Sequence, residues 1–200
     1  MNFTPKINEA LRLASRLHRD QVRKDKEHTP YISHLVAVAM ILSEATDDEE
    51  IIMAGLLHDA LEDAPNYTYE NLVADCGARV AEIVKHVTEP LDANKAEEDQ
   101  LPWLFRKESY LNNLRSGGKE SAMVSASDKL HNTDSLIFGI THEQEEFLSR
   151  FHSSLRNKLW FHQQVLLIIE EKLSKDNILV SKLSLSTREL EKLVISYEAR

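Results

Sequence analysis

The sequence of 200 residues is poor in the residues that make tight turns and covalent cross-links. It has five glycines, five prolines and one cysteine, Cys76. A single cysteine cannot form an intrachain disulfide, and it also excludes zinc clusters built from thiolates and CxxC redox centres. The glycines match neither GxxxxGK[ST] nor GxGxxG, which excludes phosphate binding by a glycine-rich loop. Any metal ion must therefore be bound through nitrogen and oxygen atoms.

Long apolar runs are also missing. The longest run of valine, leucine and isoleucine alone is Val165 to Ile169, and no apolar run approaches the roughly 20 residues that cross a bilayer. The opening sequence MNFTPKINEALR contains no apolar signal segment. We therefore expect a cytoplasmic protein that makes no contact with a membrane.

Positive charge is in deficit. The chain has 24 Lys+Arg against 33 Asp+Glu, a formal net charge of −9. Nucleic-acid binding normally depends on a dominant basic surface, so we expect no nucleic-acid partner. Binding of a small anionic ligand is still compatible with this charge wherever basic residues cluster locally.

What the sequence does contain is the 3.6-residue periodicity of amphipathic helices. Together with a hydrophobic content of 42%, enough for one buried core, it predicts a single all-α domain over residues 1–200. We expect roughly eight to ten helices in one compact bundle. Their predicted ranges are 5–21, 34–43, 49–63, 69–75, 78–88, 103–114, 119–136, 141–174 and a last helix after Ser186, with residues 141–200 completing the core.

Four local patterns predict where helices begin. Thr4-Pro5 has the order of an N-cap and a first helical residue, and capping boxes are predicted at Thr46–Glu49, Thr141–Gln144 and Ser186–Glu189. The linker 89–100 is polar and is expected to be exposed. Residues 178–185 alternate weakly, which allows a short strand, although a lone strand would have no partner.

The sharpest chemical signal is the stretch LLHDALED, residues 56–63, in which polar groups interrupt an apolar helix. On a continuous helix His58 would lie beside Glu62, and Asp59 beside Asp63. A single histidine on a helix face is more often a hydrogen-bonded core residue than a metal ligand. Three carboxylates next to it make a metal site the favoured interpretation, because partly buried carboxylates repel one another without a cation.

Two further residues are candidates to complete a metal site. His34 lies on the preceding predicted helix, and Asp128 lies in the segment ASDKLHN. Each has a simpler alternative: His34 caps its helix, and Asp128 pairs with Lys129 or with an arginine.

With these residues in this order, the sequence resembles the HD-domain metal-dependent phosphohydrolases, and specifically the hydrolase domain of the RelA/SpoT enzymes that degrade ppGpp. The five residues between Lys24 and Pro30 resemble the stand-alone small alarmone hydrolases, which lack a synthetase domain. The resemblance is ordered and spans residues 18–136. It is carried by His18-x-x-Gln21-x-Arg23-Lys24, Pro30-Tyr31-Ile32-x-His34 with Val38-Ala39, Leu56-Leu57-His58-Asp59-x-x-Glu62-Asp63, Gly77-x-x-Val80, Val87-Thr88-Glu89, Arg106-Lys107 and Asp128-Lys129-Leu130-x-Asn132.

The resemblance implies a metal site and a catalytic pair. It assigns catalysis to Glu62 and Asp63, of which one orients or deprotonates the attacking water. It implies Mn²⁺ as the ion, and two imidazoles with two carboxylates independently suit a divalent ion of this kind, although zinc also accepts such ligands. The implied metal ligands are His34, His58, Asp59 and Asp128.

The resemblance also implies substrate contacts, each of which has a simpler alternative. Arg23 and Lys24 would bind phosphate, or form a solvated helix end. Asn132 would contact the nucleoside or ribose, or face solvent from a helix. Tyr31 would line the base pocket, or simply pack.

The implied reaction is attack of water on the phosphorus attached to the ribose 3′ oxygen of (p)ppGpp, which releases pyrophosphate and leaves GDP or GTP. The chain departs from the common pattern at Leu35 (usually proline), His28 (often glycine) and Asp134 (commonly arginine). Asp134 bears on substrate identity, so ppApp and NADPH stay open as alternative substrates.

Two non-enzymatic functions stay open as well. A nucleotide sensor that does not turn its ligand over is disfavoured, because such a sensor has no need of Glu62 and Asp63. An interaction protein would use the predicted helix 141–174, whose apolar positions are better explained by core packing. Trp160, Phe161 and His162 on that helix have two interpretations, the far wall of the substrate pocket or core packing, of which core packing is favoured. The sequence leaves the oligomeric state open.

Overall fold

The computed structural model describes residues 3–90, 101–143, 145–150 and 153–199. The regular elements of these residues are all helices, which confirms the all-α prediction. An isolated bridge pairs Val22 with Pro30. None of the helices described is both long enough and apolar enough to cross a membrane. In chain order they are α1 (Pro5–Leu17), α2 (Ile32–Leu42), α3 (Glu49–Leu57), α4 (Ala60–Asp63), α5 (Tyr69–Cys76), α6 (Ala78–Lys85), α7 (Trp103–Ser116), α8 (Lys119–His142), α9 (Glu145–Leu148), α10 (Leu155–Lys172) and α11 (Ile178–Glu198).

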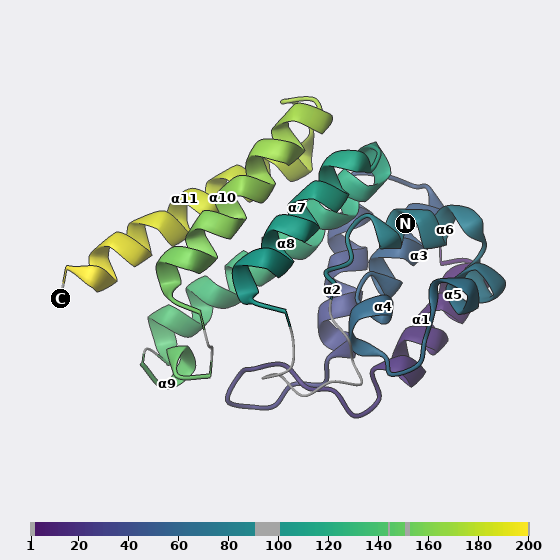
Figure 1. Ribbon diagram of the computed structural model, residues 1–200, viewed down its shortest axis with the longest axis horizontal. Coiled ribbons are helices and arrows are strands. Elements are labelled where there is room, and N and C mark those ends of the chain that lie inside the picture. Colours follow the sequence, from purple (N-terminus) through teal and green to yellow (C-terminus); the bar gives the residue numbers. More distant parts are fainter. Residues whose placement is uncertain (1–2, 91–100, 144, 151–152, 200) are drawn as a thin grey trace.

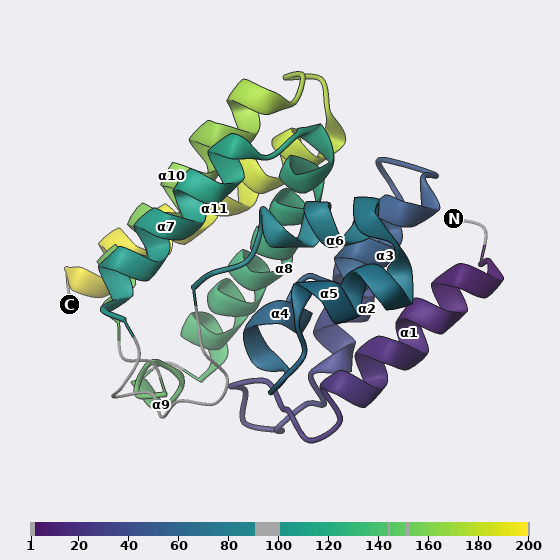
Figure 2. The same ribbon diagram turned by 45° about the vertical axis from the view of Figure 1, so that its right-hand side comes forward.

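Helix α8 is the element on which two groups of helices pack. The first group is α1 to α6, of which α2, α3 and α6 contact α8. The second group contains α7, α10 and α11, and each of these also contacts α8. Figure 1 shows α1 to α6 on the right and α10 and α11 on the left, and Figure 2 shows α7 together with α10 and α11 on the left of α8. Residues of α8 therefore face both the N-terminal motifs and the C-terminal helices.

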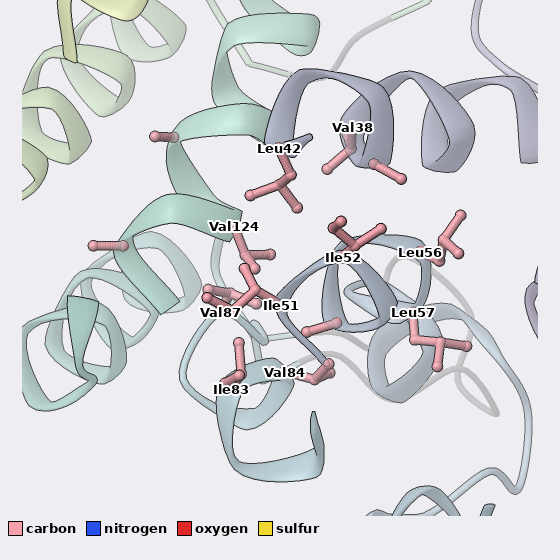
Figure 3. Close-up of a cluster of buried hydrophobic side chains, with 14 of the residues drawn as sticks. Val38, Leu42, Ile51, Ile52, Leu56, Leu57, Ile83, Val84, Val87 and Val124 are labelled. Atoms are coloured by element: carbon pink, nitrogen blue, oxygen red, sulfur yellow. The ribbon is translucent and has the colours of Figure 1, made fainter. Parts of the chain in front are cut away.

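The main core fixes α2, α3, α6 and α8 against one another (Figure 3). Leu42, Leu57, Val84 and Val124 come from these four helices and are completely buried. Burial of one such side chain stabilises the fold by about 1.5–3 kcal/mol. Helices α2 and α8 carry His34 and Asp128, and α3 directly precedes His58 and Asp59, so the core also sets where the four predicted metal ligands lie.

The predicted helix 49–63 is broken in the middle, which corrects the expectation of one continuous helix. Helix α3 ends at Leu57 and α4 begins at Ala60, with Asp59 between them at φ −94° and ψ 0°. The imidazole of His58 donates from Nδ1 to the carbonyl oxygen of Gly55 at 2.8 Å and so competes for an acceptor that a continuous helix would use. The backbone N–H of Asp63 still donates to the carbonyl oxygen of Asp59 at 3.0 Å, so Asp63 lies one helical turn beyond Asp59 despite the break.

Three predicted N-caps are wrong, although α3 begins at Glu49 as predicted. The N-cap of α3 is Asp48, which accepts from the Glu50 N–H, and not Thr46. Thr141 lies inside α8, and α10 begins only after Ser154, so the single helix 141–174 is wrong; Gln144 lies outside the described residues. Ser186 lies inside α11, which Asn177 caps, so residues 178–185 are helical and the short strand is wrong.

The linker prediction is wrong at its first residue. Glu89 is buried, and it forms ion pairs with Arg106 and Lys107 of α7. Residues 91–100 of this linker lie outside the described part of the chain.

Candidate metal centre

Two buried imidazole rings face one another at the centre of the fold. His34 of α2 is fully buried, and His58 at the end of α3 is 2% exposed. The Nδ1 atoms of both rings are hydrogen-bonded, that of His58 to the Gly55 carbonyl and that of His34 to Nδ1 of His131 at 2.8 Å. Both Nε2 atoms are buried and have no hydrogen-bond partner among the described residues.

Two carboxylates face these Nε2 atoms. Oδ2 of Asp59 lies 3.1 Å from the Nε2 of His58 and 3.7 Å from that of His34. Oδ1 of Asp128, on α8, lies 3.2 Å from the Nε2 of His34 and 3.5 Å from that of His58. The structure therefore brings all four predicted metal ligands together. Ligand atoms of His34, His58 and Asp59 lie within 4.8 Å of one another.

The chemistry of this donor set fits a divalent cation. The carbonyl of Gly55 keeps a proton on Nδ1 of His58, so the neutral ring turns the lone pair of Nε2 toward the carboxylates. This lone pair and the two carboxylates repel one another without a positive charge between them. Burial alone would lower the pKa of His58, but Asp59 and Asp128 raise it well above its usual value. Burial lowers the pKa of His34. A metal ion would supply the positive charge that otherwise comes from a proton on His58.

A second layer of side chains holds the carboxylates in place. The hydroxyl of Tyr31 donates to Asp59 Oδ2 at 2.6 Å. Lys129 donates to Asp128 Oδ2 at 2.6 Å, and Asn132 donates to Asp128 Oδ1 at 2.5 Å. The simpler prediction for Asp128, pairing with Lys129, is therefore also confirmed, but it involves the oxygen that faces away from the two histidines.

Glu62 and Asp63 lie close to the metal ligands but bind to different partners. Glu62 accepts from the backbone N–H of Glu89 at 2.5 Å, and Asp63 Oδ2 accepts from Nε2 of Gln21 at 2.7 Å. Burial, followed by the charge of Glu89, raises the pKa of Glu62 well above its usual value. Burial, followed by the charge of Asp59, raises the pKa of Asp63 to about 6. Asp63 is thus disposed to take up a proton near neutral pH, and Glu62 takes one up more readily than an ordinary glutamate does.

A cavity of about 790 Å³ opens beside these groups. All four predicted substrate-contact residues, Arg23, Lys24, Tyr31 and Asn132, line it, as does Asp63. Arg23 donates to Asn132 Oδ1 at 2.9 Å, so the amide of Asn132 links Arg23 to Asp128. A volume of this size suits a small molecule.

The structure also places three lysines at the cavity that the sequence reasoning did not select, namely Lys107, Lys129 and Lys158. Phe161 and His162 line it as well, although core packing was the favoured interpretation for both. Burial, with Lys107 and Lys24 nearby, lowers the pKa of Lys158 to about 8. Helical spacing held a signal for this lysine, because Lys158 precedes Phe161 and His162 by three and four residues on the inner side of α10. A lysine on a buried helix face is uncommon and marks a site for closer attention.

The affinity for Mn²⁺ is expected to rise with pH. Below the raised pKa of His58 its ring carries a proton that a metal ion must displace. Release of one proton increases the association constant by about tenfold per pH unit, and this slope flattens above that pKa. Calorimetric titration with Mn²⁺ at about pH 6, 6.5 and 7 measures it. A His142→Gln variant, altered at an exposed position, keeps the same slope; an affinity independent of pH would contradict the assignment of His58.

Comparison with known proteins adds an independent set of observations. A family model described as HD domain matches residues 10–149. The chain is 37% identical over 131 residues to guanosine-3′,5′-bis(diphosphate) 3′-pyrophosphohydrolase MESH1 of Danio rerio, covering 64% of this chain and 68% of the relative. It is 36% identical over 126 residues to the MESH1 of Homo sapiens, covering 62% and 65%. A solved structure described as a metazoan ortholog of SpoT that hydrolyses ppGpp superposes with a TM-score of 0.73 at 27% identity, covering 94% of this chain and 97% of the other.

Proposed function

The chain belongs to the HD-domain family, and we propose on this basis that it hydrolyses the 3′-pyrophosphate of (p)ppGpp to GDP or GTP and pyrophosphate. The observation that carries the proposal is the pair of buried Nε2 atoms, on His34 and His58, that face Asp59 and Asp128 beside a cavity lined by cations. The relatives named as pyrophosphohydrolases of this nucleotide support it. We propose the cytoplasm, where such nucleotides occur, as the place of action.

We propose that His34, His58, Asp59 and Asp128 hold the metal ion, with Mn²⁺ as the leading candidate. When bound, a divalent ion polarises a phosphoryl oxygen and makes water more acidic. Tyr31, Lys129 and Asn132 orient the two carboxylates through the hydrogen bonds described above. The four ligands are assigned no role beyond holding the metal ion.

We propose that Glu62 and Asp63 orient the attacking water and accept its proton. Asp63 lines the cavity, and Gln21 fixes one of its oxygens. A carboxylate with a pKa of about 6 is largely ionised at neutral pH and still basic enough to accept a proton as water attacks phosphorus. The bond from phosphorus to the ribose 3′ oxygen then breaks, and that oxygen takes up a proton to give the hydroxyl of GDP.

Arg23 and Lys24 are proposed to bind the phosphates. Arg23 lies over the ring of Tyr31 at 5.6 Å and is held by Asn132, so its guanidinium is positioned before substrate arrives. A cation fixed in this way stabilises the charge that develops on the phosphoryl oxygens.

A second substrate is favoured by one departure from the family pattern. Asp134 lines the cavity where the hydrolases commonly carry arginine, and it accepts from the Ser186 hydroxyl at 2.5 Å. An aspartate there removes one attractive charge for a polyanion, so ppApp and NADPH are the alternative substrates of the same chemistry. The placement of Glu62 and Asp63 at the site argues against a sensor that binds a nucleotide without turning it over.

Product analysis tests the proposal. Purified protein with Mn²⁺ is given ppGpp, ppApp or NADPH, and the products are separated by ion-exchange chromatography. We expect GDP and pyrophosphate in equal amounts from ppGpp. Turnover of ppApp or NADPH alone would keep the mechanism and change the substrate, whereas no turnover of any of the three would contradict the enzymatic function.

Replacement of Arg23 by glutamine is expected to raise the KM for ppGpp by about 10- to 100-fold, because a hydrogen bond from a charged donor to phosphate is lost. The effect is measured from initial rates of pyrophosphate release. Arg19→Gln serves as the matched control, since Arg19 is exposed on the same segment and does not line the cavity. Equal KM values for the two variants would remove Arg23 from the substrate site.

A further inference from the structure

A buried histidine on α10 lines the cavity and takes no part in the mechanism above. His162 is 6% exposed and comes from the C-terminal group of helices, which packs on α8 (Figure 2). Its Nδ1 lies 2.7 Å from the hydroxyl oxygen of Thr133, a fully buried residue of α8. The pair joins the wall of the cavity to the helix that carries Asp128 and Asn132.

The hydrogen bonds of Thr133 determine which nitrogen of His162 carries the proton. The Thr133 hydroxyl donates its only hydrogen to the carbonyl oxygen of Lys129 at 2.6 Å. It can therefore only accept from His162, so Nδ1 of His162 is the protonated nitrogen. In the neutral ring Nε2 then carries a lone pair, on a side chain that lines the cavity.

The surroundings keep this ring neutral. Burial, followed by the charge of Lys129, lowers the pKa of His162 to about 3. The charged groups that act on it are Lys129, Lys107 and Lys158, which lower the pKa, and Asp128, which raises it. The cavity thus contains an uncharged hydrogen-bond acceptor among several cationic donors.

We propose that His162 is a specificity-determining residue whose Nε2 accepts a hydrogen bond from an uncharged donor on the nucleoside part of the substrate. A phosphate at neutral pH offers oxygen lone pairs, which the lone pair of Nε2 repels, whereas the lysines and Arg23 attract it. The nucleoside of ppGpp offers three donors that suit Nε2: guanine N1–H, the exocyclic amine and the ribose 2′ hydroxyl. This inference rests on the proposed function.

Binding of product nucleotides tests it independently of turnover. GDP, inosine diphosphate (no exocyclic amine), 2′-deoxy-GDP (no 2′ hydroxyl) and N1-methyl-GDP (no N1–H) are titrated by calorimetry into the Mn²⁺-loaded wild type and into His162→Phe. We expect the wild type to bind one analogue about tenfold more weakly than GDP, the effect of one lost hydrogen bond. His162→Phe is expected to bind GDP about tenfold more weakly than the wild type does, and to bind that same analogue as tightly as it binds GDP.

A second pair of variants separates the tautomer from packing. Thr133→Val leaves His162 in place but removes the acceptor that holds the proton on Nδ1, and it is expected to give the same analogue pattern as His162→Phe. Thr133→Ser keeps the hydroxyl and restores the binding that Thr133→Val loses. Nitrogen-15 NMR of the His162 ring in the free protein is expected to show protonated Nδ1 in the wild type and in Thr133→Ser.

Three results would overturn the inference. They are equal weakening of all four nucleotides in His162→Phe, unchanged GDP binding in that variant, and a wild type that binds the three analogues as tightly as GDP. Failure of the proposed function is seen separately, as the absence of GDP formation from ppGpp by the wild type.

Discussion

Asp59→Asn is expected to lower kcat/KM for ppGpp by at least about a thousandfold, a loss of roughly 4 kcal/mol of transition-state stabilisation. Oδ2 of Asp59 faces the Nε2 atoms of both His58 and His34. An amide oxygen there still accepts the hydrogen bond from Tyr31 but carries no full negative charge, so the site binds a divalent cation more weakly. Initial rates at saturating Mn²⁺, together with the dissociation constant for Mn²⁺ from calorimetry, measure the two effects.

The matched control for this variant is Asp20→Asn, which alters an exposed aspartate near the end of α1. Thermal unfolding without metal is expected to be similar for both variants, because the fold depends on the apolar core rather than on the metal ligands. Addition of Mn²⁺ is expected to raise the unfolding temperature of the control far more than that of Asp59→Asn. Full activity in Asp59→Asn would show that the metal ion, if any, binds elsewhere.

Asp63→Asn is expected to lower kcat by about 100- to 10,000-fold, the usual contribution of a positioned acid or base. Its affinity for Mn²⁺ is expected to stay within about threefold of the wild type, because Asp63 bonds to Gln21 and not to the two histidines. Glu62→Gln is expected to lower kcat as well, with a similar retention of metal. Steady-state kinetics and calorimetry on the same preparations provide both numbers.

Glu70→Gln is the control for these two variants, since Glu70 is exposed at the start of α5. A loss of metal affinity that parallels the loss of kcat would place Asp63 among the metal ligands. Wild-type kcat in both Asp63→Asn and Glu62→Gln would leave the pair without a catalytic role.

The fold class was predictable because helical periodicity dominates the sequence, whereas several boundaries depended on competition between hydrogen bonds. Thr4 caps α1 as predicted, since its hydroxyl accepts from the Ile7 N–H. Thr46 and Ser186 have the right residue types for capping, but Asp48 and Asn177 are better placed and take the role. The break after Leu57 accompanies a contact between the His58 ring and the Gly55 carbonyl, which residue spacing does not encode.

The four candidate metal ligands could be selected because the HD pair, His34 and Asp128 match the ordered motifs of the family that the sequence resembles. Their convergence depends on the packing of α2 and α3 on α8, and the core residues of these helices show the apolar pattern for it. The wall of the cavity was harder to predict. Lys158 and His162 belong to a helix far along the chain, and the favoured interpretation of His162 as core packing described its burial but not its contact with the cavity.

The most direct test of the central claim is a measurement of GDP and pyrophosphate formed from ppGpp by metal-free protein, before and after addition of one equivalent of Mn²⁺. The four-residue site of His34, His58, Asp59 and Asp128 predicts no product before the addition and equal amounts of GDP and pyrophosphate after it. Undiminished GDP formation by the metal-free protein would contradict the account, and so would a Mn²⁺-loaded protein that leaves ppGpp intact.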